Sequence, residues 1–287
     1  MQLSCVLELS LNQIESDFIE FVAKKRNRPY AILAQTFLET RMRFRFSGLQ
    51  FRELGDTIHN LFRVMYDDSD ETALVESYRF HALLHLFRFI SYSYPGTPKP
   101  RDYYYLKYFL KAISRGELKF ILHRASQCLH NNYVEVAKTL VDRAHGCHTV
   151  VDYGCGLGYI SFEIGKLVPN CEVHLVDIDC LTLEFAEFRF RKHAINVHVI
   201  PVSEDQMYPK LPPCNVCIAT EVMEHVMQPL RVYKNIYEAL QTGGILYGDF
   251  SNHHKEIFHV TPQLDDLRQS IAKDFRKLDS MSYEKIR

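Results

Sequence analysis

The first half of the chain carries a helical pattern of apolar positions. From Leu7 to Val22 apolar residues recur at intervals of three and four, and neither glycine nor proline interrupts residues 1–28. Such intervals place apolar side chains along one side of a helix. Helical patterns continue to about residue 145, with a clear break in the stretch rich in proline at residues 94–100. The pattern predicts an all-helical N-terminal domain over residues 1–145.

The second half, residues 146–287, alternates short β-rich runs with helical segments and is predicted to be an α/β domain. Helices are expected at residues 160–167 and 262–273, and from Glu221 onward. A sixth strand is predicted at residues 275–280, which leaves only residues 283–287 for a further one. The first five predicted strands lie at residues 150–152, 172–177, 197–202, 215–220 and 243–250.

A glycine-rich loop follows the first predicted strand. Asp152 ends the strand, and Gly154, Gly156 and Gly158 follow at alternate positions before a helix that includes Ile160. Glycine has no Cβ and tolerates positive φ, so such a loop lets a ligand touch the backbone. The free N–H groups at the start of the helix point toward the same ligand. The loop therefore predicts a ligand site at the end of this strand.

The spacing of the glycines distinguishes two kinds of ligand. A dinucleotide-binding loop has the pattern G-x-G-x-x-G, but the last of these positions is Tyr159 or Ser161 here, depending on the glycine from which one counts. The pattern G-x-G-x-G after Asp152 instead resembles motif I of the class I S-adenosylmethionine-dependent methyltransferases. The order of the predicted strands up to residue 250 agrees with that family. The resemblance implies a Rossmann-like sheet of seven strands, whose last strand is either short or cut off by the end of the chain.

The resemblance also implies which residues bind the cofactor, S-adenosylmethionine. Asp177 ends the second strand 23 residues after Gly154, near the separation of about 20 residues at which a ribose-binding acid follows a glycine loop. Its two oxygens would accept both ribose hydroxyls, while Ile178 packs on adenine and Ser203 or Glu204 meets the adenine edge. The full predicted set is Asp152, Gly154, Cys155, Gly156, Gly158, Asp177, Ile178, Ser203, Glu204 and Thr220.

A second cluster, Glu221, Glu224 and His225, follows the fourth predicted strand. On a helix, this spacing places three side chains on one face. The same pattern occurs in quinone-biosynthesis O-methyltransferases, which the catalytic domain resembles, and in small-RNA 3′-end 2′-O-methyltransferases, where it can hold a divalent cation. The resemblance thus implies a site for Mg²⁺ or Mn²⁺ that draws a substrate hydroxyl toward alkoxide.

Two alternatives for this cluster need no metal. In one, the acid and the imidazole buttress the cofactor loop. In the other, His225 or His254 takes a proton from the acceptor, since the unperturbed pKa of imidazole suits a general base. Glu221 would then lie near the transferring methyl group, so Glu221, His225 and His254 are the predicted catalytic residues.

Composition narrows the range of partners and compartments. The 287 residues have a net charge of −1, which counts against a large polyanionic substrate. The sequence has no run of 18 apolar residues, so no membrane-spanning helix is expected. The N-terminus lacks the basic region of a signal peptide. Eight scattered cysteines suit a reducing cytoplasm better than a disulfide scaffold.

Together these patterns predict an S-adenosylmethionine-dependent methyltransferase with a small-molecule acceptor, methylated preferentially on oxygen rather than on nitrogen or carbon. The helical domain would serve as a lid, a substrate pocket or the interface of a homodimer. One alternative is a metal-assisted RNA 2′-O-methyltransferase, suggested by residues 221–225. The other is a non-catalytic protein that binds S-adenosylmethionine.

Overall fold

The structure is a computed structural model that describes residues 13–27, 29–32, 34, 133–179, 181–203, 206–252, 261 and 263–286. The chain divides into two units, residues 1–77 and 78–287, and each is considered by itself. The domain boundary predicted near residue 145 follows a long stretch outside the described residues and stays a prediction.

The first unit contains helix α1, Gln13–Arg26. Its buried apolar residues recur at intervals of three and four, with some adjacent positions between them, as expected for a wide apolar face of an amphipathic helix. Lys24 and Glu20 form an ion pair of 2.8 Å on the exposed side. The helical prediction is confirmed for this segment, whereas the helical segments predicted between residues 35 and 132 lie outside the described residues. The buried apolar residues of α1 are Ile14, Phe18, Ile19, Phe21, Val22 and Ala23.

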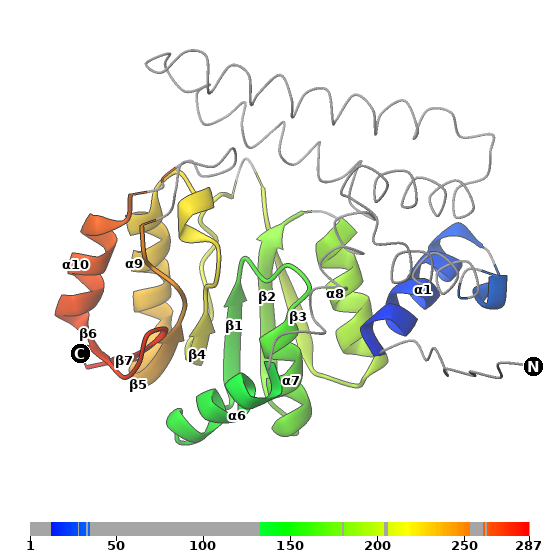
Figure 1. Ribbon diagram of the computed structural model, residues 1–287, viewed down its shortest axis with the longest axis horizontal. Coiled ribbons are helices and arrows are strands. Elements are labelled where there is room, and N and C mark those ends of the chain that lie inside the picture. Colours follow the sequence, from blue (N-terminus) through cyan, green and yellow to red (C-terminus); the bar gives the residue numbers. More distant parts are fainter. Residues whose placement is uncertain are drawn as a thin grey trace, which may run out of the picture. The chain divides into compact units, whose positions relative to one another are not determined.

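The second unit contains a seven-stranded sheet in the order β3-β2-β1-β4-β5-β7-β6 (Figure 1). Neighbouring strands from β3 to β5 are parallel, and β7 runs antiparallel to β5 and β6. The predicted Rossmann-like sheet of seven strands is confirmed, and its last strand is short, with four residues. The strands are β1 Thr149–Tyr153, β2 Glu172–Ile178, β3 Val197–Val202, β4 Cys214–Ile218, β5 Leu240–Tyr247, β6 Phe275–Lys277 and β7 Ser282–Lys285.

Helices cover both faces of this sheet. Successive strand residues point to opposite sides, and apolar residues on both sides are buried against helices. Val150 and Val173 pack with α6, α7 and α8, whereas Val151 and Val176 pack with α9 and α10. In Figure 1, α9 and α10 lie together beside β4 and β5. No helix of the described residues is both long and apolar enough to cross a membrane. The helices are α6 Tyr133–Arg143, α7 Tyr159–Leu167, α8 Leu181–Lys192, α9 Pro229–Ala239 and α10 Asp265–Asp274.

The segment after β4 differs from the sequence prediction. A helix was expected from Glu221, but the chain forms only a 3-10 turn, η2 Met223–His225, and α9 begins at Pro229. Glu221 has φ 54°, the left-handed conformation, which interrupts helical geometry at the predicted start. Pro229 occupies the first helical position, where a missing N–H costs nothing. The prediction of a helix over residues 221–226 is therefore wrong.

We predict that Phe162→Ala destabilises the second unit by about 3–5 kcal/mol, the usual cost of emptying a buried aromatic site. Phe162 is fully buried in α7 and packs edge-on against Phe190 at 5.2 Å, with the Arg189 guanidinium 3.6 Å from its ring centre. Leu167→Ala on the same helix is the matched control, because Leu167 is 41% exposed. Chemical denaturation followed by circular dichroism measures both, and equal small losses would contradict this account of the core.

Candidate active site

The site begins at the end of the central strand β1. Asp152 is buried, and its Oδ2 accepts a hydrogen bond from the Ser161 hydroxyl on α7. Burial raises the pKa of Asp152 to about 7, the Asp177 carboxylate adds to the rise, and the bond from Ser161 opposes it. Asp152 therefore joins the strand to the helix that follows the glycine loop, and it holds a carboxyl group that titrates near neutral pH.

The three glycines of the loop all have positive φ, but for different physical reasons. A Cβ on Gly154 would lie 2.2 Å from Cγ2 of Val222, and one on Gly158 would lie 2.8 Å from the Phe190 ring. A Cβ on Gly156 would meet no atom within 4 Å. Gly154 and Gly158 are thus required by packing, whereas Gly156 borders open space that a ligand can occupy.

Asp177 links this open space to the end of β2. Its Oδ2 accepts the Gly156 N–H at 2.7 Å, and its Oδ1 accepts the Ile178 N–H at 2.7 Å. Burial raises the pKa of Asp177, and the two backbone donors act in the opposite direction. The glycine loop is also held to the strand directly, since the Gly154 and Cys155 N–H groups both donate to the Val176 carbonyl. The Asp177 carboxylate is therefore bonded to the loop backbone beside the open space at Gly156, and its role in binding ribose stays a prediction.

The residues predicted to meet adenine lie at the neighbouring strand end. Ile178 pairs with Val202 in the β2–β3 register, and the Asp179 N–H donates to the Val202 carbonyl at 3.2 Å. Ser203 follows β3 directly and closes a small turn, in which its Oγ accepts the Gln206 N–H at 3.2 Å. Ser203 is therefore beside the end of β2. Glu204 lies outside the described residues, so its predicted role stays a prediction.

The cluster after β4 has a different geometry from the one predicted. Glu221 is exposed, whereas Glu224 is fully buried in turn η2 and lies 3.7 Å from Nε2 of His225. The absence of a helix removes the argument that these three side chains share one face. Within the described residues, they do not meet as a group of metal ligands. Their roles as ligands or as catalytic residues stay predictions, and His254 lies outside the described residues.

Turn η2 is anchored to the segment that follows β5. The Thr261 N–H donates to the Glu224 carbonyl at 3.0 Å, and the Thr261 hydroxyl donates to the Val226 carbonyl at 2.9 Å. Val222, which fills the space beside Gly154, immediately precedes the turn. The loop after β4 is therefore fixed on one side by the glycine loop and on the other by Thr261.

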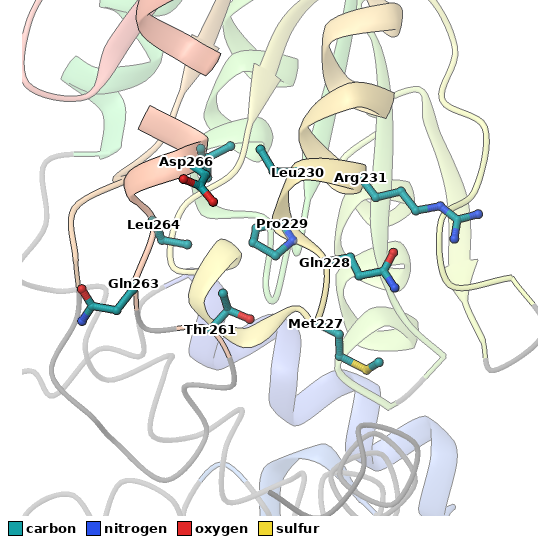
Figure 2. Close-up of a pocket in the computed structure, with 10 residues that line it drawn as sticks. Met227, Gln228, Pro229, Leu230, Arg231, Thr261, Gln263, Leu264 and Asp266 are labelled. Carbon is teal, nitrogen blue, oxygen red and sulfur yellow. The ribbon is translucent and has the colours of Figure 1, made fainter. Parts of the chain in front are cut away.

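A cavity of about 430 Å³ lies beyond this turn, between the starts of α9 and α10. Figure 2 shows that its lining residues come from two segments, which lie thirty or more residues apart in the sequence. At the first of these segments, the Arg231 guanidinium lies over the Tyr208 ring at 4.3 Å. No motif marks these residues, which is why sequence reasoning missed the cavity. They are Met227, Gln228, Pro229, Leu230, Arg231, Thr261, Gln263, Leu264, Asp266 and Leu267.

Comparison with known proteins agrees with this geometry. Residues 145–285 match the family described as a methyltransferase domain. The chain is 26% identical over 163 residues to malonyl-[acyl-carrier protein] O-methyltransferase 1 of Ilyobacter polytropus, covering 53% of this chain and 59% of that protein. It is 27% identical over 139 residues to malonyl-[acyl-carrier protein] O-methyltransferase of Halalkalibacterium halodurans, covering 46% of this chain and 50% of that protein. The chain thus spans only about half of the length of these relatives.

Two solved structures match the chain at low TM-scores. The crystal structure of LaPhzM has 17% identity and a TM-score of 0.44, covering 73% of this chain and 68% of that one. A putative caffeoyl-CoA O-methyltransferase from Staphylococcus aureus has 11% identity and a TM-score of 0.43, covering 62% and 98%. The family match covers the sheet, the glycine loop and Asp177, the features from which the site was built. Residues 145–285 of this chain therefore form a class I S-adenosylmethionine-dependent methyltransferase domain.

Proposed function

We propose that this chain transfers the methyl group of S-adenosylmethionine to a small-molecule or carrier-linked acceptor, preferentially on oxygen. The observation that carries the proposal is the open space beside Gly156, bordered by the Asp177 carboxylate. The relatives named as malonyl-[acyl-carrier protein] O-methyltransferases support an oxygen acceptor.

The described residues fit S-adenosylmethionine at this space. Gly156 has no side chain to occupy it, and the Asp177 oxygens provide acceptors for ribose hydroxyls. Ile178 and Ser203, at the neighbouring strand ends, are the proposed contacts of the adenine. Cys155 is buried within the glycine loop, and Thr220 lies two residues after the end of β4. Both are proposed contacts of the methionine portion of the cofactor.

The sulfonium of S-adenosylmethionine supplies an already activated methyl group, so the protein has to align the acceptor and remove a proton where the acceptor carries one. His225 is the proposed general base among the described residues, because its imidazole is 31% exposed after β4. Oε1 of the buried Glu224 lies 3.7 Å from Nε2 of His225. Glu221 is exposed and would lie closer to the acceptor. Mg²⁺ or Mn²⁺ held by residues 221–225, and proton removal by His254, are the alternatives to this role.

The proposal includes a cytoplasmic location. It is supported by the free thiols of the described cysteines, which are Cys147, Cys155, Cys171, Cys214 and Cys217. A homodimer formed through the N-terminal helices and an RNA acceptor are secondary proposals. Retention of RNA that weakens steeply with salt would favour the RNA acceptor.

We predict that Gly156→Ala abolishes cofactor binding without unfolding the domain. The added methyl meets no protein atom but enters the proposed cofactor space, and the left-handed conformation itself costs only about 1–2 kcal/mol. Calorimetric titration with S-adenosylhomocysteine measures binding, and thermal unfolding measures the fold.

Gly154→Ala is the contrasting variant. Its methyl would collide with Val222, so this variant is expected to unfold at a clearly lower temperature. Normal affinity for S-adenosylhomocysteine in Gly156→Ala would place the cofactor elsewhere.

We predict that Asp177→Ala weakens the binding of S-adenosylhomocysteine by at least about tenfold, since a hydrogen bond to a charged group is worth roughly 1.5–3 kcal/mol. Asp179→Ala is the matched control, because Asp179 is exposed and lies two residues further on. Both affinities come from the same titration. If the two variants bind alike, the ribose role of Asp177 is wrong.

We predict that the effect of His225→Ala depends on the acceptor. Removing a general base slows proton transfer by about 10²–10⁴-fold, so kcat with hydroxyl acceptors should fall in that range. A carboxylate acceptor is already ionised at neutral pH and should be methylated at nearly the wild-type rate. Methyl transfer from labelled S-adenosylmethionine to both acceptor classes, with and without EDTA, provides the measurement. Unchanged rates with every acceptor would remove His225 from the mechanism, and loss of activity in EDTA would favour the metal alternative.

A further inference from the structure

Two histidines and one glutamate come together on β2 and β3, away from the glycine loop. Glu172 and His174 are two residues apart on β2 and therefore point to the same face. His198 on β3 is the register partner of His174. The two imidazole rings stack with centroids 4.8 Å apart and an angle of 17° between their planes.

The ligand atoms of the three side chains form a compact group. One nitrogen from each histidine and one oxygen of Glu172 all lie within 4.8 Å of one another. Glu172 is the first residue of β2, whereas the glycine loop and Asp177 lie at the other end of the parallel strands. The group is thus separate from the proposed cofactor site, and the inference does not depend on the proposed function.

His174 carries an unsatisfied polar atom that faces this group. Its side chain is only 12% exposed, and its Nε2 is buried with no hydrogen-bond partner among the described residues. The same nitrogen lies 3.8 Å from Oε2 of Glu172, too far for a hydrogen bond. A buried polar nitrogen without a partner is unfavourable. A cation between the nitrogen and the carboxylate would satisfy both.

We propose that Glu172, His174 and His198 bind a divalent transition-metal ion, and that Zn²⁺ suits them best. Two imidazoles select Zn²⁺, Co²⁺, Ni²⁺ or Cu²⁺ over Mg²⁺ and Ca²⁺, which prefer ligand sets made only of oxygen. Three protein ligands and a water complete a tetrahedral zinc site. In such a site the ligand atoms lie roughly 3.3 Å apart, given metal–nitrogen distances of about 2.0–2.1 Å. Glu172 and His198 are exposed, so their side chains are free to rotate out of the stacked arrangement and close the group around the ion.

The position of the site defines its role as a clamp at the edge of the sheet. β3 is the edge strand and its neighbour is β2, so the ion would cross-link the two strands. Among the described residues between β3 and β4, no helix is present to cover this edge. A metal that binds the folded state alone stabilises it by mass action, so Zn²⁺ should raise the temperature of thermal unfolding.

The test is titration of the full, metal-free chain with Zn²⁺ by calorimetry, and with Co²⁺ followed by its visible absorption. The chain has 14 histidines, so the readout is the difference between matched variants. Wild type should bind one more equivalent of Zn²⁺ than His198→Ala. Glu172→Gln should bind Zn²⁺ at this site at least about tenfold more weakly than wild type, because even the loss of a partner that only orients a ligand costs about 10–100-fold in metal affinity. Mg²⁺ should not compete.

His145→Asn is the matched control, because His145 is exposed, lies outside the group, and has the left-handed backbone that asparagine tolerates. It should bind Zn²⁺ as wild type does. The unfolding temperature should rise with Zn²⁺ in wild type and in this control, but less in His198→Ala. Wild-type stoichiometry and affinity in both His198→Ala and Glu172→Gln would overturn the proposal. Both substitutions are at exposed positions, so normal circular dichroism is expected to show that a loss of binding is not a loss of fold.

Discussion

The close packing of the glycine loop is the constraint on which the proposed active site depends. Gly154 lies against Val222, and Gly158 lies against the Phe190 ring, so neither position has room for a Cβ. These two contacts bring the loop after β4 and helix α8 against the end of β1. The backbone of Gly156 is left facing open space between them. The shape of the glycine loop therefore depends on these packing contacts as well as on the conformational freedom of its glycines.

Electrostatics at the strand ends follow from the same packing. Asp152 and Asp177 are both enclosed near the glycine loop, and burial raises the pKa of each carboxyl group. Backbone N–H groups and the Ser161 hydroxyl offset this cost in part. Asp152 contributes to the connection between strand and helix, while Asp177 accepts the N–H groups of Gly156 and Ile178 at the end of β2. Asp152 and Asp177 both lie near the end of a strand, but they differ in their hydrogen-bond donors: the Ser161 hydroxyl for Asp152, and backbone N–H groups for Asp177.

The cavity beyond turn η2 is built differently from the glycine loop. It has no short motif, and its lining residues come from the starts of α9 and α10 together with Thr261. Such surfaces can vary without disturbing the sheet, because loops at the strand ends contribute little to the core. The match of residues 145–285 to the methyltransferase family therefore identifies the domain and not its acceptor.

The α/β alternation and the glycine loop followed by Asp177 could be read from the amino-acid sequence, because they depend on local patterns: β-branched runs, glycine spacing and strand order. The sequence left open whether the seventh strand is short or cut off, and the structure shows a short one. The sequence failed at Glu221, where a helix was expected: the backbone there is left-handed, and the neighbouring Val222 and turn η2 make contacts with distant segments that no local pattern encodes. Only the tertiary structure decided that Glu224 is buried while Glu221 is exposed. It alone also brought His198 beside His174 and formed the cavity at α9 and α10, because these neighbours are set by strand register and packing between segments far apart in the chain.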